Sequence, residues 1–307
     1  MGEWAMKDYL VRATIGQGEA RILAVRTTEL VEEARVRHDT WHTVTAALGR
    51  AMSGAAMLGA LLKDDGVVTV RVAGDGPVNG MIVQADRQGK VRGYALEPHV
   101  FVPLNDQGKL DVAAAVGTEG NLYVTYDMRM KEPYTGVSQL VSGEVGEDLT
   151  FYLASSEQIP SAVALGVMVD PGGAVKAAGG LLVQLLPDAR PGLAEAIEER
   201  LGRLNFISSL FESGLAPEEI LHQLFGEMDL KILETMELGF ECRCSRDRAA
   251  SVLMGLGEDE LKEILEEDGG AEVRCHFCGE VVNFDESDIE GLIYLVENGQ
   301  PDDRRLS

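Results

Sequence analysis

The motif Cys242-Arg243-Cys244, together with Cys275-His276-Phe277-Cys278, contains all four cysteines of this 307-residue chain. Thirty residues separate the two pairs. Each pair brings two sulfur atoms close enough to bind one small ion, and four thiolates complete the tetrahedral shell that zinc prefers. A disulfide framework is the other common use of paired cysteines, but four cysteines would cross-link little of so long a chain. The spacing therefore predicts one zinc ion bound by these four cysteines.

The same two pairs permit a redox chemistry. Zinc holds cysteine sulfur as thiolate, which is the nucleophilic and oxidisable form. The two members of each pair are close enough to bond to each other, although a Cys-x-Cys disulfide closes a small, strained ring. Four cations flank the cysteines and favour the thiolate form: Arg243, Arg246, Arg248 and Arg274. Spacing alone leaves both a permanent structural zinc site and a redox-active one open.

Further sequence blocks accompany the cysteine motifs. They are Glu266-Glu267-Asp268-Gly269, Gly74-Asp75-Gly76-Pro77-Val78-Asn79, Tyr134-Thr135-Gly136-Val137, Ser155-Ser156-Glu157-Gln158-Ile159-Pro160 and Ala177-Ala178-Gly179-Gly180. With these blocks, the order Cys-x-Cys then Cys-x-x-Cys, and a mass of 33.1 kDa, the chain resembles the redox-regulated heat-shock chaperones of about 33 kDa. The resemblance extends over nearly the whole sequence.

This resemblance implies a molecular chaperone that acts as a holdase without ATP. Such a protein would bind unfolding client proteins and prevent their aggregation during oxidative stress. Activation would accompany zinc release and disulfide formation, with Cys242 bonded to Cys244 and Cys275 bonded to Cys278. The family also implies a homodimer in the oxidised form. Neither catalytic residues nor a cofactor other than zinc is expected.

The N-terminal part of the chain, residues 1–186, is predicted to be an α+β core domain. It shows runs of strands with helices set apart, without the regular alternation of a doubly wound sheet. Strand patterns occupy residues 9–15, 19–26, 67–72, 80–85, 91–96, 122–128, 136–142, 162–169 and 181–185. Helical patterns occupy residues 28–37, 41–62 and 147–158.

The remaining chain is predicted to form a helical linker and a zinc redox-switch domain. Pro187 and Pro191 interrupt the pattern and mark the start of the linker, residues 187–241. Its helices, at 193–201, 205–212 and 217–225, carry one apolar stripe each and must therefore lie on another surface. The zinc domain, residues 242–298, is predicted to have helices at 259–267 and 287–298 and a strand at 280–284. It contains so few large apolar side chains that its stability should depend on zinc.

The net negative charge of the chain limits the kinds of molecule that it can bind. The chain has a net charge of −24, and residues 187–307 hold 29 acidic and 11 basic residues, a net charge of −18. Such a field repels nucleic-acid phosphates, which argues against a zinc ribbon that binds nucleic acid. A zinc-ribbon interaction module with a structural metal remains the alternative function.

No run is apolar enough to span a bilayer and no secretory leader pattern is present, so clustered thiols indicate the cytoplasm.

An enzyme is the other class considered, but residues 1–186 show no convincing catalytic constellation. Gly54 and Gly59 lack the Gly-Lys-Ser/Thr ending of a phosphate loop, so we expect them to serve close packing. His38 and His42 are four residues apart and could share a metal on a helix, but no third ligand is apparent. We expect a surface pair without a metal.

Overall fold

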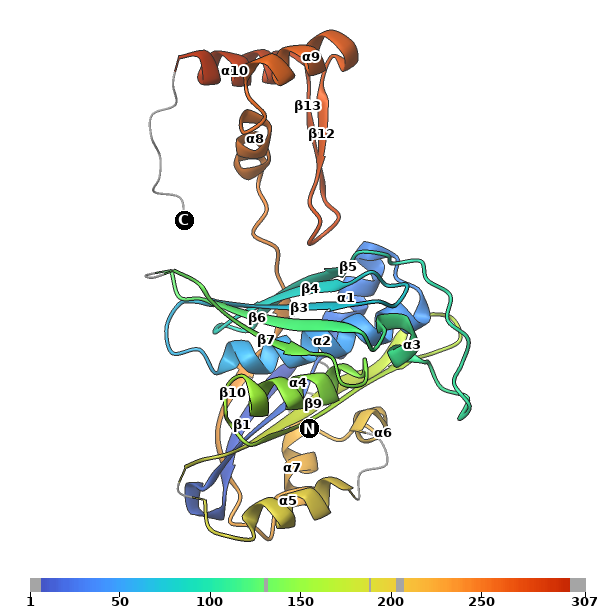
Figure 1. Ribbon diagram of the computed structural model, residues 1–307, viewed down its shortest axis with the longest axis vertical. Helices are drawn as coiled ribbons and strands as arrows, with labels where there is room; N and C mark the ends of the chain where they lie inside the picture. Colours follow the sequence, from blue (N-terminus) through green and yellow to red (C-terminus); the bar gives the residue numbers. More distant parts are fainter. Residues whose placement is uncertain (1–6, 130–131, 188, 203–206, 299–307) are drawn as a thin grey trace. The chain divides into compact units, whose positions relative to one another are not determined.

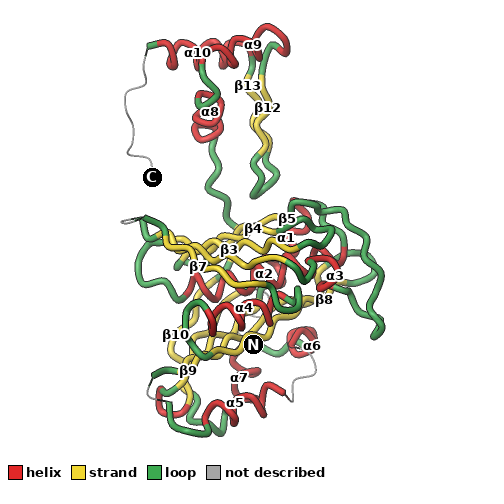
Figure 2. Tube along the Cα trace, in the orientation of Figure 1, coloured by secondary structure: helices red, strands yellow, loops and turns green. Residues whose placement is uncertain are grey.

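The computed structural model describes residues 7–129, 132–187, 189–202 and 207–298. The chain forms two compact units, residues 1–241 and residues 242–307, and each is considered by itself. Helices and strands occur in both units (Figure 2), so the predicted α+β class is confirmed. Among the described residues, no helix is long and apolar enough to cross a membrane.

Two sheets form the frame of the first unit (Figure 1). The five-stranded sheet has the order β10-β1-β2-β9-β8, with bounds Lys231–Glu237, Tyr9–Ile15, Ala20–Arg26, Val175–Leu185 and Ser161–Val169. The six-stranded sheet has the order β11-β5-β4-β3-β6-β7, with bounds Gly239–Phe240, Lys90–Ala95, Met81–Asp86, Val67–Gly74, Gly120–Asp127 and Tyr134–Gln139. Neighbouring strands are antiparallel, except that β11 runs parallel to β5. The nine predicted strand patterns all correspond to strands of these sheets.

Helix α2 (His42–Ala60) lies between the two sheets and is buried along almost its whole length (Figure 1). Its small residues allow the neighbouring elements to pack close to the helix backbone. A Cβ atom on Gly49 would lie 2.6 Å from a methyl group of Val31, and one on Gly54 would lie 2.5 Å from a methyl group of Leu149. Helices α1 (Thr28–His38), α3 (Val112–Val116) and α4 (Val145–Ser155) complete this core. The glycines of α2 therefore serve close packing, as expected.

The central strands of the five-stranded sheet, β1, β2 and β9, are buried on both faces. Leu23 and Val25 of β2 belong to the core around α2, whereas the intervening Ile22 and Ala24 belong to a second apolar cluster. Three helices cover this second face: α5 (Leu193–Gly202), α6 (Ile207–Glu212) and α7 (Pro217–Phe225). Their stripes therefore lie on another surface, as predicted. The predicted linker also contributes β10 and β11, which the sequence patterns did not indicate, and its residues 205–206 lie outside the described ranges.

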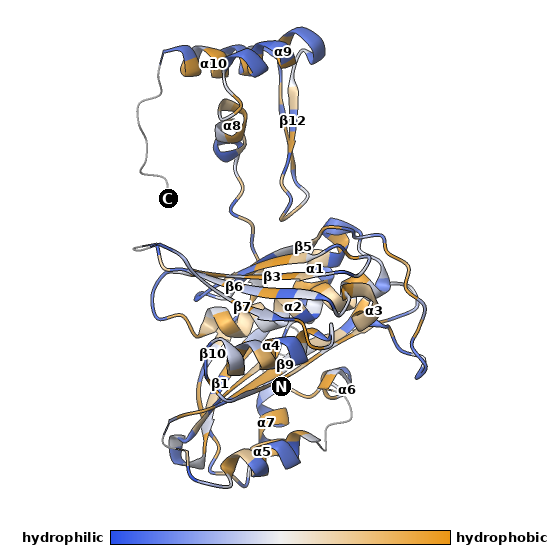
Figure 3. Ribbon diagram, in the orientation of Figure 1, coloured by the Kyte–Doolittle hydropathy of each residue, from blue (hydrophilic) through white to orange (hydrophobic). Residues whose placement is uncertain are grey.

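The second unit is small and its core is thin. It consists of α8 (Arg246–Met254), α9 (Glu258–Asp268), the hairpin β12 (Ala271–Arg274) and β13 (Val281–Phe284), and α10 (Glu286–Glu297). Its buried apolar residues are Ala249, Leu253, Leu261, Phe284, Ile289, Leu292 and Ile293. Helix α9 is mostly hydrophilic (Figure 3) and buries only Leu261. The sequence patterns missed α8 and β12, and they placed the start of α10 one residue late.

Helix α6 packs directly against two glycines of the five-stranded sheet. Gly166 of β8 and Gly179 of β9 are paired across the two strands. A Cβ atom on Gly166 would lie 2.7 Å from the backbone nitrogen of Ser208, and one on Gly179 would lie 2.5 Å from the ring of Phe211. Both distances are shorter than van der Waals contact, so this approach of helix to sheet requires glycine at both positions.

We predict that Gly166→Ala loosens α6, because the added Cβ atom would lie 2.7 Å from the backbone nitrogen of Ser208 and 2.8 Å from a methyl group of Ile207, both in this helix. The expected cost is about 1–3 kcal/mol of unfolding free energy, as for other overpacked sites. Denaturant unfolding and hydrogen exchange of the α6 amides measure it. Gly202→Ala is the matched control, since no described atom lies within 4 Å of the position that its added Cβ would take. Equal stability of the two variants would contradict this account of α6.

Candidate metal centre

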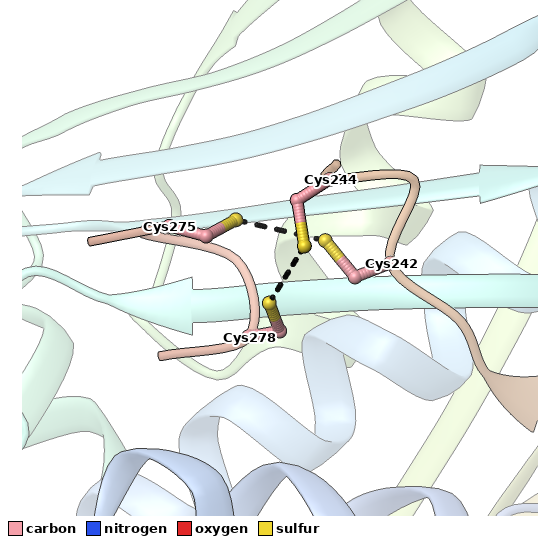
Figure 4. Close-up of side chains that lie close together, drawn as sticks. All are labelled: Cys242, Cys244, Cys275 and Cys278. Carbon is pink, nitrogen blue, oxygen red and sulfur yellow. Dashed lines mark hydrogen bonds between the residues drawn. The ribbon is translucent and has the colours of Figure 1, made fainter. Parts of the chain in front are cut away.

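The four cysteines meet at one point in the second unit. Cys242 and Cys244 lie in the segment that precedes α8, and Cys275 and Cys278 lie in the turn of the β12–β13 hairpin. All four sulfur atoms lie within 4.8 Å of one another. Two close contacts join the two arms: Cys242 Sγ lies 3.6 Å from Cys275 Sγ, and Cys244 Sγ lies 3.3 Å from Cys278 Sγ (Figure 4). The sequence-predicted cysteines are therefore brought together.

Backbone hydrogen bonds shape the hairpin arm. The amide of Cys275 donates to the carbonyl of Glu280 at 2.9 Å, and the amide of Gly279 donates to the carbonyl of Cys275 at 2.8 Å. These bonds fold the chain back immediately after Cys278. Gly279 has a φ of 73°, in the left-handed region that favours glycine. The turn therefore carries the sulfurs of Cys275 and Cys278, and the pairing of β12 with β13 supports it.

Arg246 connects the other arm to the body of the unit. Its guanidinium donates to the carbonyl of Asn283 at 2.8 Å and to the carboxylate of Asp288 at 2.5 Å. It also lies 4.5 Å from the centre of the Phe284 ring. The hydrogen bond from Arg246 lowers the pKa of Asp288, so the pair stays charged at neutral pH. Ser245 begins α8 by accepting a hydrogen bond from the amide of Arg248.

The thiols and their spacing fit a single metal ion. Four ligands about 2.3 Å from a tetrahedral ion lie about 3.8 Å apart, which matches the clustered sulfurs. Desolvation raises the pKa of the Cys278 thiol to about 11 and also raises the pKa of Cys244. A cation reverses this preference, because a coordinating thiol is deprotonated outright. Four soft thiolate donors are typical of zinc and iron–sulfur sites.

The two histidines considered from the sequence lie elsewhere, in the first unit. The ring of His38 is 6.5 Å from that of Tyr94, and Nε2 of His42 is 3.2 Å from the carbonyl oxygen of Pro171. Within the described residues, the four cysteines are the one group of three or more His, Cys, Asp or Glu side chains close enough to hold a metal.

Two contributors to the site were not found from the sequence. Arg246 was considered only for its charge, whereas it bridges the cysteine arm, the hairpin and α10. Glu280 places a carboxylate oxygen 3.6 Å from Cys244 Sγ. The only sequence feature that distinguishes Glu280 from the many other acidic residues of this region is its position two residues after Cys278.

Comparison with known proteins gives one consistent family. A family model described as "Hsp33 protein" matches residues 8–285. The 33 kDa chaperonin of Oceanobacillus iheyensis is 50% identical over 287 residues, which cover 94% of this chain and 99% of that protein. The 33 kDa chaperonin of Desulforamulus reducens is 47% identical over 292 residues, which cover 95% and 99%. The crystal structure of the 33 kDa chaperonin (heat shock protein 33 homologue) from Thermotoga maritima has a TM-score of 0.90 at 37% identity, and the match covers 95% of this chain and all of that one.

We predict that Arg246→Ala weakens metal binding by about 10-fold, because residues that orient ligands from outside the coordination shell typically have effects of 10- to 100-fold. Competition of the reduced protein with a chromogenic chelator measures the affinity. Arg274→Ala, which removes a cation next to Cys275, is the matched control for charge alone. An equal loss in both variants would show that Arg246 acts through its charge and not by bridging the arm to Asn283 and Asp288.

Proposed function

The chain belongs to the Hsp33 family, and from this premise we propose that it is an ATP-independent holdase switched on by oxidation. The family and its relatives establish a chaperone; the redox switch is our inference for this chain. The observation that supports it is the meeting of four thiols in a unit whose own core is thin. The proposal includes one zinc ion in the reduced state, a homodimer in the oxidised state and a cytoplasmic location.

Zinc is proposed to stabilise the second unit through Cys242, Cys244, Cys275 and Cys278. Seven buried apolar residues, of which only Phe284 is aromatic, give this unit little stability of its own. Zinc contributes on the order of 10 kcal/mol or more in small metal-binding domains. Loss of the metal should therefore unfold this unit, whereas the first unit keeps its own large core.

Oxidation of the thiolates is proposed as the trigger. Peroxide takes two electrons from each pair of thiolates, so that one S–S bond forms, the O–O bond breaks and two hydroxide ions leave. In the folded cluster every sulfur is within reach of the others, and distance alone does not select partners. Once the arms separate, sequence neighbours have the lowest cost of loop closure. This reasoning and the family resemblance favour Cys242 with Cys244 and Cys275 with Cys278.

The chain itself connects the cysteines to an apolar surface. Strand β11 ends two residues before Cys242, and it is held by bonds from Gly239 to Gly89 and from Glu241 to Val91, both 3.0 Å. Strand β10 precedes it, and helices α5–α7 precede β10. We infer that unfolding of the second unit loosens these elements in turn, because marginal segments open with their neighbours.

Opening of α5–α7 would expose the second apolar cluster. Its buried members on the helices are Leu193, Ile197, Ile207, Phe211, Ile220, Leu221, Leu224 and Phe225. Exposed apolar side chains bind those of an unfolded client through the same burial that holds them in the folded protein. The net charge of −18 over residues 187–307 would oppose aggregation of the opened segment.

We predict that the reduced protein binds one zinc ion and that each single Cys→Ser substitution at the four positions weakens binding. Treatment with peroxide should release the zinc and produce suppression of aggregation of a heat-unfolded test protein without ATP. Peptide mapping of the oxidised protein checks the pairing, and a Cys244–Cys275 disulfide would contradict it. Equal suppression by reduced and oxidised samples would favour the alternative, an interaction module with a purely structural metal.

We predict that oxidation removes hydrogen-exchange protection first from residues 242–298 and then from β11, β10 and α5–α7. Strands β2 and β9 should stay protected, because the core around α2 still covers one of their faces. Light scattering on the same samples reports the oligomeric state. If residues 207–298 stay protected while holdase activity appears, unfolding is not the switch and clients bind to another surface.

A further inference from the structure

Glu280 stands beside one particular cysteine of the cluster. Its backbone belongs to the hairpin turn: the carbonyl accepts from the amide of Cys275 at 2.9 Å, and the amide donates to Cys278 Sγ. Its side chain is exposed and reaches the opposite arm, where Oε2 lies 3.6 Å from Cys244 Sγ. The carboxylate thus extends from the hairpin towards the sulfur of the other arm.

This geometry makes the four sulfurs unequal. Cys244 Sγ has a second anionic ligand group within reach, since carboxylate oxygen binds zinc at about the same distance as nitrogen does. Both arms are held by hydrogen bonds: the hairpin arm by its turn, and the arm of Cys244 by Arg246 and by the bond from Arg248 to the carbonyl of Arg243. Glu280 Oε2 therefore lies only 3.6 Å from the position that Cys244 Sγ occupies.

We propose that Glu280 is a reserve metal ligand that replaces Cys244 when this sulfur leaves the metal; the proposal rests on the zinc site proposed above. The exchange substitutes one monoanionic ligand for another, so the coordination number and the charge of the site are conserved and no electron moves. Cys244 is then a free thiolate while the remaining three sulfurs and Glu280 retain the metal. Such a thiolate can attack a peroxide, forming a sulfenic acid as the O–O bond breaks and hydroxide leaves.

The test compares cysteine variants with and without the carboxylate. In the reduced full-length protein, cobalt and zinc affinities are measured by spectroscopic titration and chelator competition for Cys244→Ala and Cys275→Ala, each combined with Glu280 or Glu280→Gln. We expect Cys244→Ala to bind at least ~10-fold more tightly than Cys275→Ala, which is the size of other effects of residues next to a metal shell. Adding Glu280→Gln should abolish this advantage and leave Cys275→Ala unchanged.

The controls separate this inference from the zinc site itself. Glu272→Gln removes the same charge from the exposed face of β12 and should not affect the Cys244→Ala protein. The sulfur-to-cobalt absorption of Cys244→Ala should correspond to three thiolates. If Cys244→Ala binds no more tightly than Cys275→Ala, or binds nothing because it unfolds, Glu280 is not a reserve ligand. If the unsubstituted protein binds no metal at all, the proposed function fails instead.

Discussion

The convergence of four sulfur atoms within 4.8 Å is the constraint on which the second unit depends. It joins the segment before α8 to the turn of the β12–β13 hairpin, two pieces of chain that share little apolar surface. Hydrogen bonds from Arg246 to Asn283 and Asp288 also connect the start of α8 to the hairpin and to α10. The first unit has the opposite character, because its stability comes from a helix enclosed by two sheets and involves no cysteine. One protein therefore combines a part that is stable through burial with a part that, under the switch proposed above, would lose its order through chemistry at four sulfur atoms.

The two parts are connected by elements that are bound to the first unit to different degrees. Helix α6 packs tightly because Gly166 and Gly179 leave room for it, and α7 buries Ile220, Leu221 and Phe225. Strand β11 consists of two residues and is held by a few backbone bonds and the ion pair of Lys90 with Glu241. Such a gradient, from a short strand to a well-packed helix layer, is the arrangement in which opening begins near the cysteines and requires more free energy with each further element.

The sequence allowed nine strands of the two sheets, the helices of the first unit other than α3, and the meeting of the cysteines to be predicted, because each carries a periodic pattern or a spacing with a chemical reason. Strand β10 could not be predicted, since nearly all its side chains are exposed and its place is set by backbone bonds to β1. Helix α8 was missed because only Ala249 and Leu253 of its nine residues are buried, which leaves a weak apolar pattern. Glu280 and Arg246 owe their roles to the fold around the hairpin, and a single sequence does not record which acidic or basic residue reaches the site.

Strand β10 is an edge strand, and Lys231, Glu234 and Glu237 make it a poor template for pairing with another chain. The strand that it covers has the opposite composition, since Tyr9, Val11, Ala13 and Ile15 of β1 are buried. Departure of β10 would leave the main-chain amides and carbonyls along one side of β1 without partners. Any extended polypeptide can satisfy such groups, whatever its side chains, because main-chain hydrogen bonds do not depend on sequence. Strand β10 thus covers backbone groups of β1 that, if the opening proposed above exposed them, would accept polypeptides of unrelated sequence.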